Sequence, residues 1–178
     1  MKRILLFLFF LSASLSLHAE EKTRSNVCLN MIVKNEAHVI CRCLESVLPL
    51  IDSYLIVDTG STDGTQEVIR EYMTSHNIPG AVEERPWINF AHNRNQALEL
   101  GVATGADYLL FMDADDILTY EPDYTRPDLF DKDAYYTHIH YSGTHYDRMQ
   151  LISTKLKWAW VGVVHEVVVC PEATNCLS

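Results

Sequence analysis

The sequence has little basic charge. Its 178 residues include 14 Lys and Arg against 24 Asp and Glu, which gives a formal net charge of −10. Proteins that bind nucleic acid neutralise phosphates with Lys and Arg, so this composition argues against a nucleic-acid partner. An anionic ligand would need a local device, such as a metal ion, a helix N-terminus or a single well-placed arginine.

The sequence also has no repeat at a solenoid period, no low-complexity tract and no linker rich in Pro, Gly or Ser. With 48% hydrophobic and 21% charged residues, its composition is that of a globular protein, and its length suits one domain. The five cysteines are an odd number, which leaves at least one thiol unpaired. Cys170 and Cys176 could close a small loop if the protein is exported, whereas Cys43 fits an apolar helix face.

No apolar run is long enough for a comfortable membrane span, but the N-terminus has a pattern of its own. Lys2 and Arg3 precede an apolar run over residues 4–17, and a small-residue cleavage site could lie at Ala19. This pattern is typical of a signal peptide, so we expect an exported or lumenal protein. The alternative is an uncleaved anchor that associates with a membrane. Setting residues 1–19 aside leaves a formal charge of about −12.

Strands and helices alternate along the first two thirds of the chain. We expect strands over residues 27–33, 54–57, 81–84 and 108–112, the third being weak. Apolar residues recur at helical spacing over residues 39–48, 68–73 and 90–102. The alternation predicts an α/β fold with a mostly parallel sheet, in which functional loops follow the carboxyl ends of the strands.

The pattern changes after Asp116. Three further segments look like strands without intervening helices: residues 134–141, 146–153 and 160–169. They predict an antiparallel extension of the sheet. We therefore expect one domain over residues 26–170 and a C-terminal tail over residues 171–178.

Three carboxylates follow the apolar segment that ends at Met112. Asp113 and Asp115 are two residues apart, so in an extended chain they would point to the same side, and Asp116 comes next. Close carboxylates repel each other unless a cation lies between them, and Mg²⁺ or Mn²⁺ suits oxygen ligands. Such a cation commonly binds a diphosphate through its open positions. The alternative is a solvated acidic turn, with Asp116 as a helix cap.

Two further residues could contact a nucleotide. Asp58 ends the second expected strand and could accept hydrogen bonds from a base or ribose, whereas helix capping alone accounts for Thr62 and Asp63. Arg94 lies in the first turn of a predicted helix, where it could clamp a phosphate. In that position an arginine is also often solvated or paired with a nearby Glu.

Histidines form the remaining candidates. His165 and Glu166 interrupt an apolar run, where an unpaired charge is costly; a core histidine with one hydrogen bond is the alternative. His138 and His140 share a strand face, but a half-exposed face rich in Tyr and His explains them equally well. We predict no zinc site there.

Taken together, these segments resemble the nucleotide-diphospho-sugar transferases of the GT-A fold, specifically the family-two glycosyltransferases. The resemblance is carried by five segments that occur in the family's order: MIVKNEAHVICRCLESV, YLIVDTGSTDGTQEVI, NFAHNRNQAL, YLLFMDADD and WVGVVHE. Asn35-Glu36 together with the last segment looks most like the branch that includes bacterial lipopolysaccharide-core glucosyltransferases. The resemblance implies a Rossmann-like, mostly parallel GT-A sheet with an antiparallel C-terminal extension.

The resemblance also implies roles for residues on the nucleotide side. Val33 and Glu36 match positions that line the nucleotide pocket, and Asp58 matches the position that contacts the base. Arg94 falls in a helix that approaches the nucleotide, which favours the binding role over the solvated one.

The remaining matched positions concern the metal and the chemistry. Asp115 corresponds to the main metal ligand, Asp113 to the carboxylate near the ribose, donor sugar and metal, and His165 to a position that often completes the metal shell. The implied cofactor is Mn²⁺ or Mg²⁺. Glu166 is our choice for the base that takes the acceptor's proton, with Asp116 in reserve.

The implied function is a metal-dependent, inverting transfer of a sugar from a nucleotide-diphosphate donor, a UDP-sugar above all, to a glycan, lipid or protein acceptor. The chain stops soon after Glu166, so a non-catalytic nucleotide-sugar binding module or a truncated remnant is the alternative. A third hypothesis is an exported adhesive domain with no nucleotide site.

Overall fold

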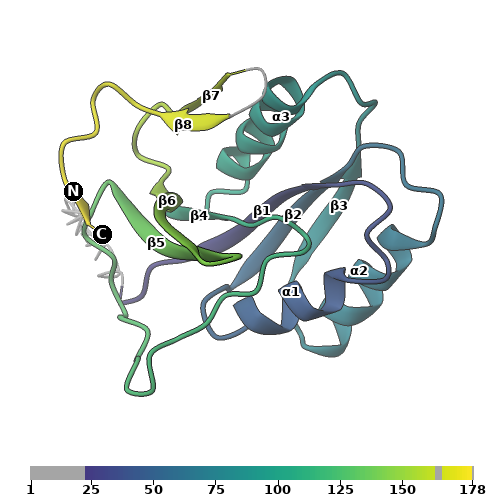
Figure 1. Ribbon diagram of the computed structural model, residues 1–178, viewed down its shortest axis with the longest axis horizontal. Coiled ribbons are helices and arrows are strands. Elements are labelled where there is room, and N and C mark those ends of the chain that lie inside the picture. The colour runs from purple at the N-terminus through teal and green to yellow at the C-terminus, as the bar shows by residue number, and fades with distance from the viewer. Residues whose placement is uncertain (1–22, 163–165, 178) are drawn as a thin grey trace, which may run out of the picture.

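Four parallel strands form one half of the central sheet (Figure 1). The structure, a computed structural model, describes residues 23–162 and 166–177. The parallel strands and the helices between them are β1 (Val27–Val33), α1 (Ile40–Val47), β2 (Ser53–Asp58), α2 (Thr65–Ser75), β3 (Gly80–Glu84), α3 (Phe90–Ala103) and β4 (Tyr108–Phe111). All of these elements were predicted, the strands to within one residue at each end.

The order of the strands indicates at which edge of the sheet a ligand site would lie. The full sheet runs β3-β2-β1-β4-β6-β5-β9, so β1 pairs in parallel with β2 on one side and with β4 on the other. Helices α1 and α2 cover one face of the sheet and α3 covers the other (Figure 1). The chain thus switches sides between β1 and β4, and ligands of open α/β sheets bind at such a switch point, beyond the carboxyl ends of the strands.

Apolar side chains bury both faces of this half. Under α1 and α2, the helix residues Ile40, Cys43 and Leu44 are fully buried against β1 and β2, as their helical spacing predicted. On the other face, Ala97 and Leu98 of α3 pack in a second cluster. Burial raises the pKa of the Cys43 thiol to about 12, which keeps it neutral and confirms its packing role.

The second half of the sheet is mostly antiparallel, as predicted. It consists of β5 (Ala134–Tyr141) and β6 (Thr144–Ser153), with β6 antiparallel to both β4 and β5. Residues 171–178, expected as a tail, instead add a short strand, β9 (Cys176–Leu177), parallel to β5. Asp133 holds this segment because its Oδ2 accepts hydrogen bonds from the backbone N–H groups of Thr174 and Asn175, both at 2.9 Å.

The prediction of one strand over residues 160–169 was wrong. Two short strands, β7 (Ala159–Val161) and β8 (Val167–Val169), pair antiparallel in a separate two-stranded sheet. Gly162 follows β7 with a φ of 113°, a left-handed conformation that turns the chain and that glycine adopts without steric cost. An apolar run alone does not reveal such a turn.

The described residues also bear on the cysteines and on membrane association. All five cysteines are free thiols, Cys170 and Cys176 included. No helix in the described ranges is long and apolar enough to cross a membrane. The predicted signal peptide or anchor over residues 1–19 lies outside the described residues.

Gly101 lets α3 approach β1 closely. A Cβ on Gly101 would lie 2.8 Å from Nδ2 of Asn30, and that amide donates a hydrogen bond to the carbonyl of Ala97 at 2.8 Å. We expect Gly101→Val to lower the free energy of unfolding by about 1–3 kcal/mol, because the added methyl groups overpack this contact. Urea denaturation measures the change. Val102→Ala, at an exposed position of the same helix, is the control and should shift stability by less than about 0.5 kcal/mol.

Candidate functional site

Two clefts lie beyond the carboxyl ends of the parallel strands, and Arg94 and Asp113 line both of them. The β1 cleft, of about 320 Å³, has walls from the end of β1, the loop after β4 and the start of α3. The β6 cleft, of about 580 Å³, lies between β6 and the β7–β8 hairpin. The position agrees with the edge that the strand order predicts.

The β1 cleft brings together most of the predicted nucleotide and metal residues. Its lining includes Val33, Glu36, Arg94, Asp113 and Asp115. These residues come from three separate segments of the chain, which meet because β1 and β4 are adjacent parallel strands. Asp58 is not part of the lining.

Asp58 instead shapes the loop beside the β1 cleft. Only 1% of it is exposed, and its Oδ1 accepts hydrogen bonds from the backbone N–H groups of Gly60 at 2.9 Å and Ser61 at 2.8 Å. Its Oδ2 is buried and has no partner among the described residues. An unpaired buried carboxylate oxygen is costly, and Asp58 lines neither cleft. The predicted base contact stays a prediction.

The loop after β2 holds the loop after β1. Asn35 has a left-handed φ of 57°, and its Oδ1 accepts a hydrogen bond from the N–H of Thr62 at 2.8 Å. Asp63 accepts from the N–H of Ala37 through one oxygen and bonds Thr65 through the other. The N-cap of α2 is Gly64, without a side-chain cap. The polar side chains predicted to cap α2 therefore mainly position the Glu36 side of the cleft.

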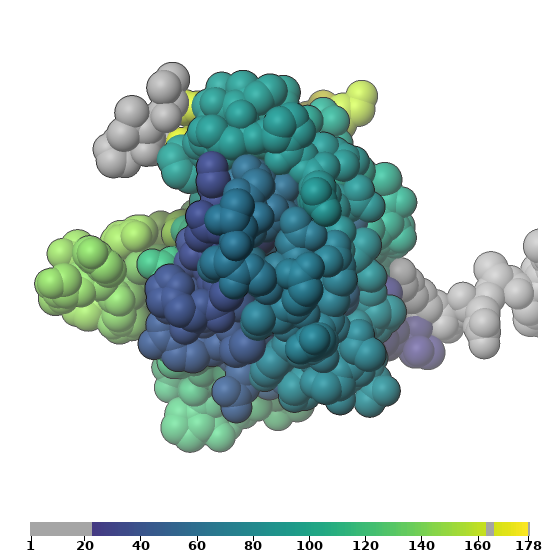
Figure 2. All heavy atoms as spheres, turned by 90° about the vertical axis from the view of Figure 1, so that its right-hand side faces the viewer, coloured from purple at the N-terminus to yellow at the C-terminus, as the bar shows by residue number. Residues whose placement is uncertain are grey.

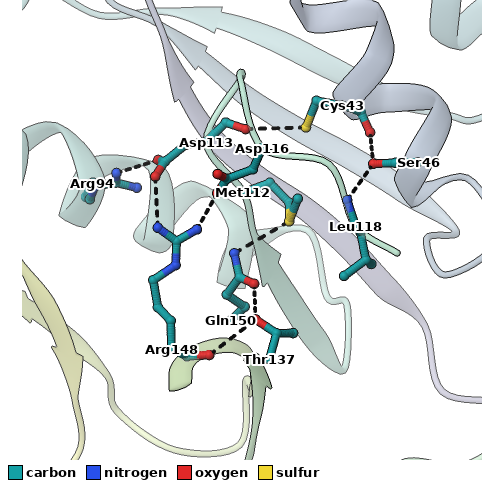
Figure 3. A network of polar contacts seen from close by, with 10 residues as sticks. All are labelled: Cys43, Ser46, Arg94, Met112, Asp113, Asp116, Leu118, Thr137, Arg148 and Gln150. Carbon is teal, nitrogen blue, oxygen red and sulfur yellow. Dashed lines mark hydrogen bonds and ion pairs between the residues drawn. The ribbon is translucent and has the colours of Figure 1, made fainter. Parts of the chain in front are cut away.

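Two arginines surround Asp113. Arg94 of α3 bonds its Oδ1 at 2.7 Å, and Arg148 of β6 bonds its Oδ2 at 3.1 Å (Figure 3). The second branch of the Arg148 guanidinium forms an ion pair with Asp116. Protein side chains thus supply the positive charge between Asp113 and Asp116.

This arrangement sets the charge of Asp113. Burial by itself would raise the pKa of the carboxyl group, but the charges of Arg94 and Arg148 outweigh burial and hold the pKa below its ordinary value of 3.8. Asp113 therefore stays ionised at neutral pH.

Contacts from α1 and β6 fix the segment after β4. The Cys43 thiol donates to the backbone carbonyl of Asp113 at 3.4 Å, and Ser46 Oγ accepts from the N–H of Leu118 at 3.0 Å. From the other side, the buried amide of Gln150 donates to Sδ of Met112 at 3.6 Å (Figure 3). The acidic segment is held before any ligand binds.

Asp115 is the exception within this segment. It is exposed at the β1 cleft and makes no hydrogen bond or ion pair with the part of the chain that the structure describes. Glu36 lies in the same cleft, where burial, and then the negative charge of Asp115, raise the pKa of its carboxyl group. Both carboxylates would gain from a cation.

Asp115 and Glu36 could hold a divalent cation that needs only one or two carboxylates from the protein. Within the described ranges no three His, Cys, Asp or Glu side chains form a metal cluster. Mg²⁺ needs no such cluster, because it keeps several waters and binds through one or two carboxylates together with phosphate oxygens. Asp115 has the free oxygens for this role, whereas both oxygens of Asp113 meet arginines. His165 lies outside the described residues.

Glu166 lines the β6 cleft. Its Oε1 is buried without a hydrogen-bond partner among the described residues. The neighbouring β7 is fixed to α3, because the Asn95 side chain donates to the carbonyl of Trp160 at 2.9 Å and accepts from its N–H at 2.8 Å. The Arg94 guanidinium also lies over the Trp160 ring, 4.8 Å from its centroid.

Arg148 is the main site residue that sequence reasoning missed. It lies in a segment that reads only as a strand, and nothing local links it to Asp113 and Asp116. The antiparallel pairing of β4 with β6 creates the link, because Leu110 lies opposite Leu151 and the two chains continue past each other from there. The histidines behave as expected of an exposed face, with His138 bonded to Asp147.

Comparisons with known proteins show which family the chain matches. The sequence profile described as Glycosyl transferase family 2 matches residues 28–153, well over half of the chain. A TPR repeat-containing protein of Synechococcus elongatus is 38% identical over 98 residues, which are 54% of this chain and 22% of that protein. An uncharacterized glycosyltransferase of Rickettsia felis is 32% identical over 91 residues, 51% of this chain and 29% of that protein. The chain thus spans less than a third of each relative.

Solved structures of similar chains include the mannosyltransferase PcManGT from Pyrobaculum calidifontis, in complex with GDP-Man and Mn²⁺. Its TM-score is 0.45 at 24% identity, over 53% of this chain and 28% of that chain. S. aureus TarS in complex with UDP has a TM-score of 0.44 at 21% identity, over 52% of this chain and 28% of that chain.

The double ion pair of Arg148 predicts a measurable stability effect. We expect Arg148→Met to lower the free energy of unfolding by about 1–2 kcal/mol, because it leaves Asp116 and one oxygen of Asp113 without a cation in a partly buried setting. Chemical denaturation measures this loss. Arg85→Met is the matched control: the Arg85 side chain is 33% exposed, against 32% for Arg148, but among the described residues its only ion pair is with Glu83. An equal loss in both variants would contradict the special role of Arg148.

The lowered pKa of Asp113 predicts acid sensitivity. Because the folded-state pKa lies below the unfolded value, the ion pairs contribute stability above pH 3.8, and this contribution is lost as the pH falls through the folded-state pKa. Asp113→Asn has no such group to titrate. Denaturation at about pH 6 and about pH 3 should therefore show a smaller acid-induced loss in the variant than in the wild type. Equal losses would mean that Asp113 is not the group responsible.

Proposed function

The chain belongs to glycosyl transferase family 2, and from this premise we propose that it transfers a sugar from a nucleoside-diphosphate donor to an acceptor hydroxyl. One observation carries the proposal: the ionised Asp113 lines both clefts, the unpaired Asp115 lines the β1 cleft, and Glu166, with its buried Oε1, lines the β6 cleft. A donor in one cleft and an acceptor in the other would come together at Asp113.

We assign the nucleoside diphosphate to the β1 cleft. Lys34 lines this cleft and contributes positive charge, and the exposed rings of Trp87 and Phe90 offer faces on which a base can stack. Val33 and Glu36 also line this cleft, and the family resemblance implies that they line the nucleotide pocket. A UDP-sugar is the donor we propose to test first.

Asp115, with Glu36 beside it, is the group that would hold Mn²⁺ or Mg²⁺. When bound, the cation offsets negative charge on the departing diphosphate. The contribution of the chain is to keep Asp115 free, since Arg148 and Arg94 neutralise Asp113 and Asp116. His165 is an additional proposed ligand.

Glu166 is the proposed base. Its Oε1 would take the proton of the acceptor hydroxyl as the oxygen forms a bond to the anomeric carbon and the bond from that carbon to the diphosphate oxygen breaks. The nucleoside diphosphate leaves with the electron pair, and a direct displacement inverts the anomeric configuration. Asp116 is less suited, because its carboxylate is paired with Arg148.

Other parts of the proposal rest on the sequence. The lipopolysaccharide-core glucosyltransferase branch is proposed from Asn35-Glu36 and WVGVVHE, and an exported, lumenal or anchored location from residues 1–19. A non-catalytic nucleotide-sugar binding module is the second candidate, because the β1 cleft by itself holds most of the residues assigned to the nucleotide and the metal. Turnover separates the two, because a module binds UDP-sugars without releasing UDP.

Substitution of the two proposed carboxylates tests the assignment. We expect Asp115→Asn to abolish Mn²⁺-dependent release of UDP from UDP-sugars and to weaken the Mn²⁺-dependent binding of UDP, measured by calorimetry. We expect Glu166→Gln to retain UDP binding and to lower transfer by about 10²–10⁴-fold, the usual contribution of a general base.

Asp123→Asn, at an exposed loop position outside both clefts, is the control and should behave as wild type. Full transfer by Glu166→Gln would remove Glu166 as the base. If no UDP, GDP or CMP donor binds to the wild-type protein in the presence of Mn²⁺, the proposed function is wrong.

A further inference from the structure

The β6 cleft contains a strand edge that no other strand covers. β4 pairs with β6 only over Leu151 to Ser153, so residues 144–150 have no strand partner on that side within the described ranges. This part of β6 belongs to a hairpin with β5 that projects from the body of the molecule (Figure 2). Its backbone N–H and C=O groups can therefore bond a ligand in the cleft.

Aromatic side chains line the β6 cleft. Tyr136 of β5 and Tyr146 of β6 both line the cleft, with 36% and 49% of their surface exposed. Trp160 also lines the cleft, and the Arg94 guanidinium lies over its ring. A tyrosine presents an apolar ring face and a polar hydroxyl, and so suits a ligand that is apolar on its faces and polar at its rim.

The charge of the cleft disfavours an anionic ligand. Both arginines in the lining, Arg94 and Arg148, are already paired with carboxylates. Asp147 is bonded to His138, whereas Glu166 adds negative charge to the lining, and its buried Oε1 has no donor among the described residues. The cleft therefore needs a ligand that donates hydrogen bonds and carries no phosphate or carboxylate.

We propose that the β6 cleft binds a neutral carbohydrate, and that this is the acceptor class of the enzyme; the inference rests on the proposed function. The faces of a sugar ring carry C–H groups that pack on Tyr136 and Tyr146. Its equatorial hydroxyls point outward, where one donates to Glu166 and others meet the open edge of β6. A lipid chain would leave these polar and charged groups unpaired.

The hairpin offers a matched pair of variants. Tyr146→Ala removes a ring from the cleft, whereas Tyr141→Ala removes a ring that is 73% exposed on the same hairpin and does not line the cleft. Binding of maltose, N,N′-diacetylchitobiose and glucose 6-phosphate is measured by saturation-transfer NMR on the full chain with UDP and Mg²⁺. Thermal melting of each variant confirms that it folds.

We expect a neutral disaccharide to bind and glucose 6-phosphate to bind more weakly. Tyr146→Ala should raise the Kd of the disaccharide about fivefold to tenfold, the effect of one lost ring contact, and Tyr136→Ala should act in the same direction. Tyr141→Ala should stay within about twofold of wild type. In transfer assays, the acceptor KM of Tyr146→Ala should rise more than its donor KM.

Two results would overturn the inference while the proposed function stands. In the first, the protein binds UDP but binds no neutral disaccharide, or it binds glucose 6-phosphate more tightly than the disaccharide. The other is an equal loss of disaccharide binding in Tyr141→Ala and Tyr146→Ala. Failure of UDP itself to bind would instead remove the proposed function, so the two failures are distinct.

Discussion

The negative charge at the end of β4 is the constraint on which the site depends. Three carboxylates follow a buried strand within four residues, and their mutual repulsion has to be compensated. Arg94 and Arg148 compensate two of them, Asp113 and Asp116, from opposite sides. The segment is held in place as a result, and a single carboxylate, Asp115, remains for a ligand.

The same ion pairs join the two halves of the sheet. Arg94 comes from α3 of the parallel half and Arg148 from β6 of the antiparallel half, and both meet at Asp113. The two clefts share Arg94 and Asp113, which lie at this junction. A donor in the β1 cleft and an acceptor in the β6 cleft would therefore meet at Asp113.

Much of the fold could be predicted because its signals are local. The run VCLNMIV is apolar enough for a buried parallel strand, and the spacing of Ile40, Cys43 and Leu44 matches a helix that covers it. Residues 160–169 were misjudged because one apolar run contains two strands, which separate after Gly162. β9 was missed because a two-residue strand has no periodicity to detect.

By itself the sequence determined the family, the α/β order of elements and the acidic segment after the fourth strand, since each depends on residues close together in the chain. Only the tertiary structure decided which carboxylate is free. Arg148 reaches Asp113 across 35 positions because β6 runs antiparallel beside β4, and no pattern in either segment specifies that register. The pairing of β4 with β6 thereby assigned Asp113 and Asp116 to arginines and left Asp115 open.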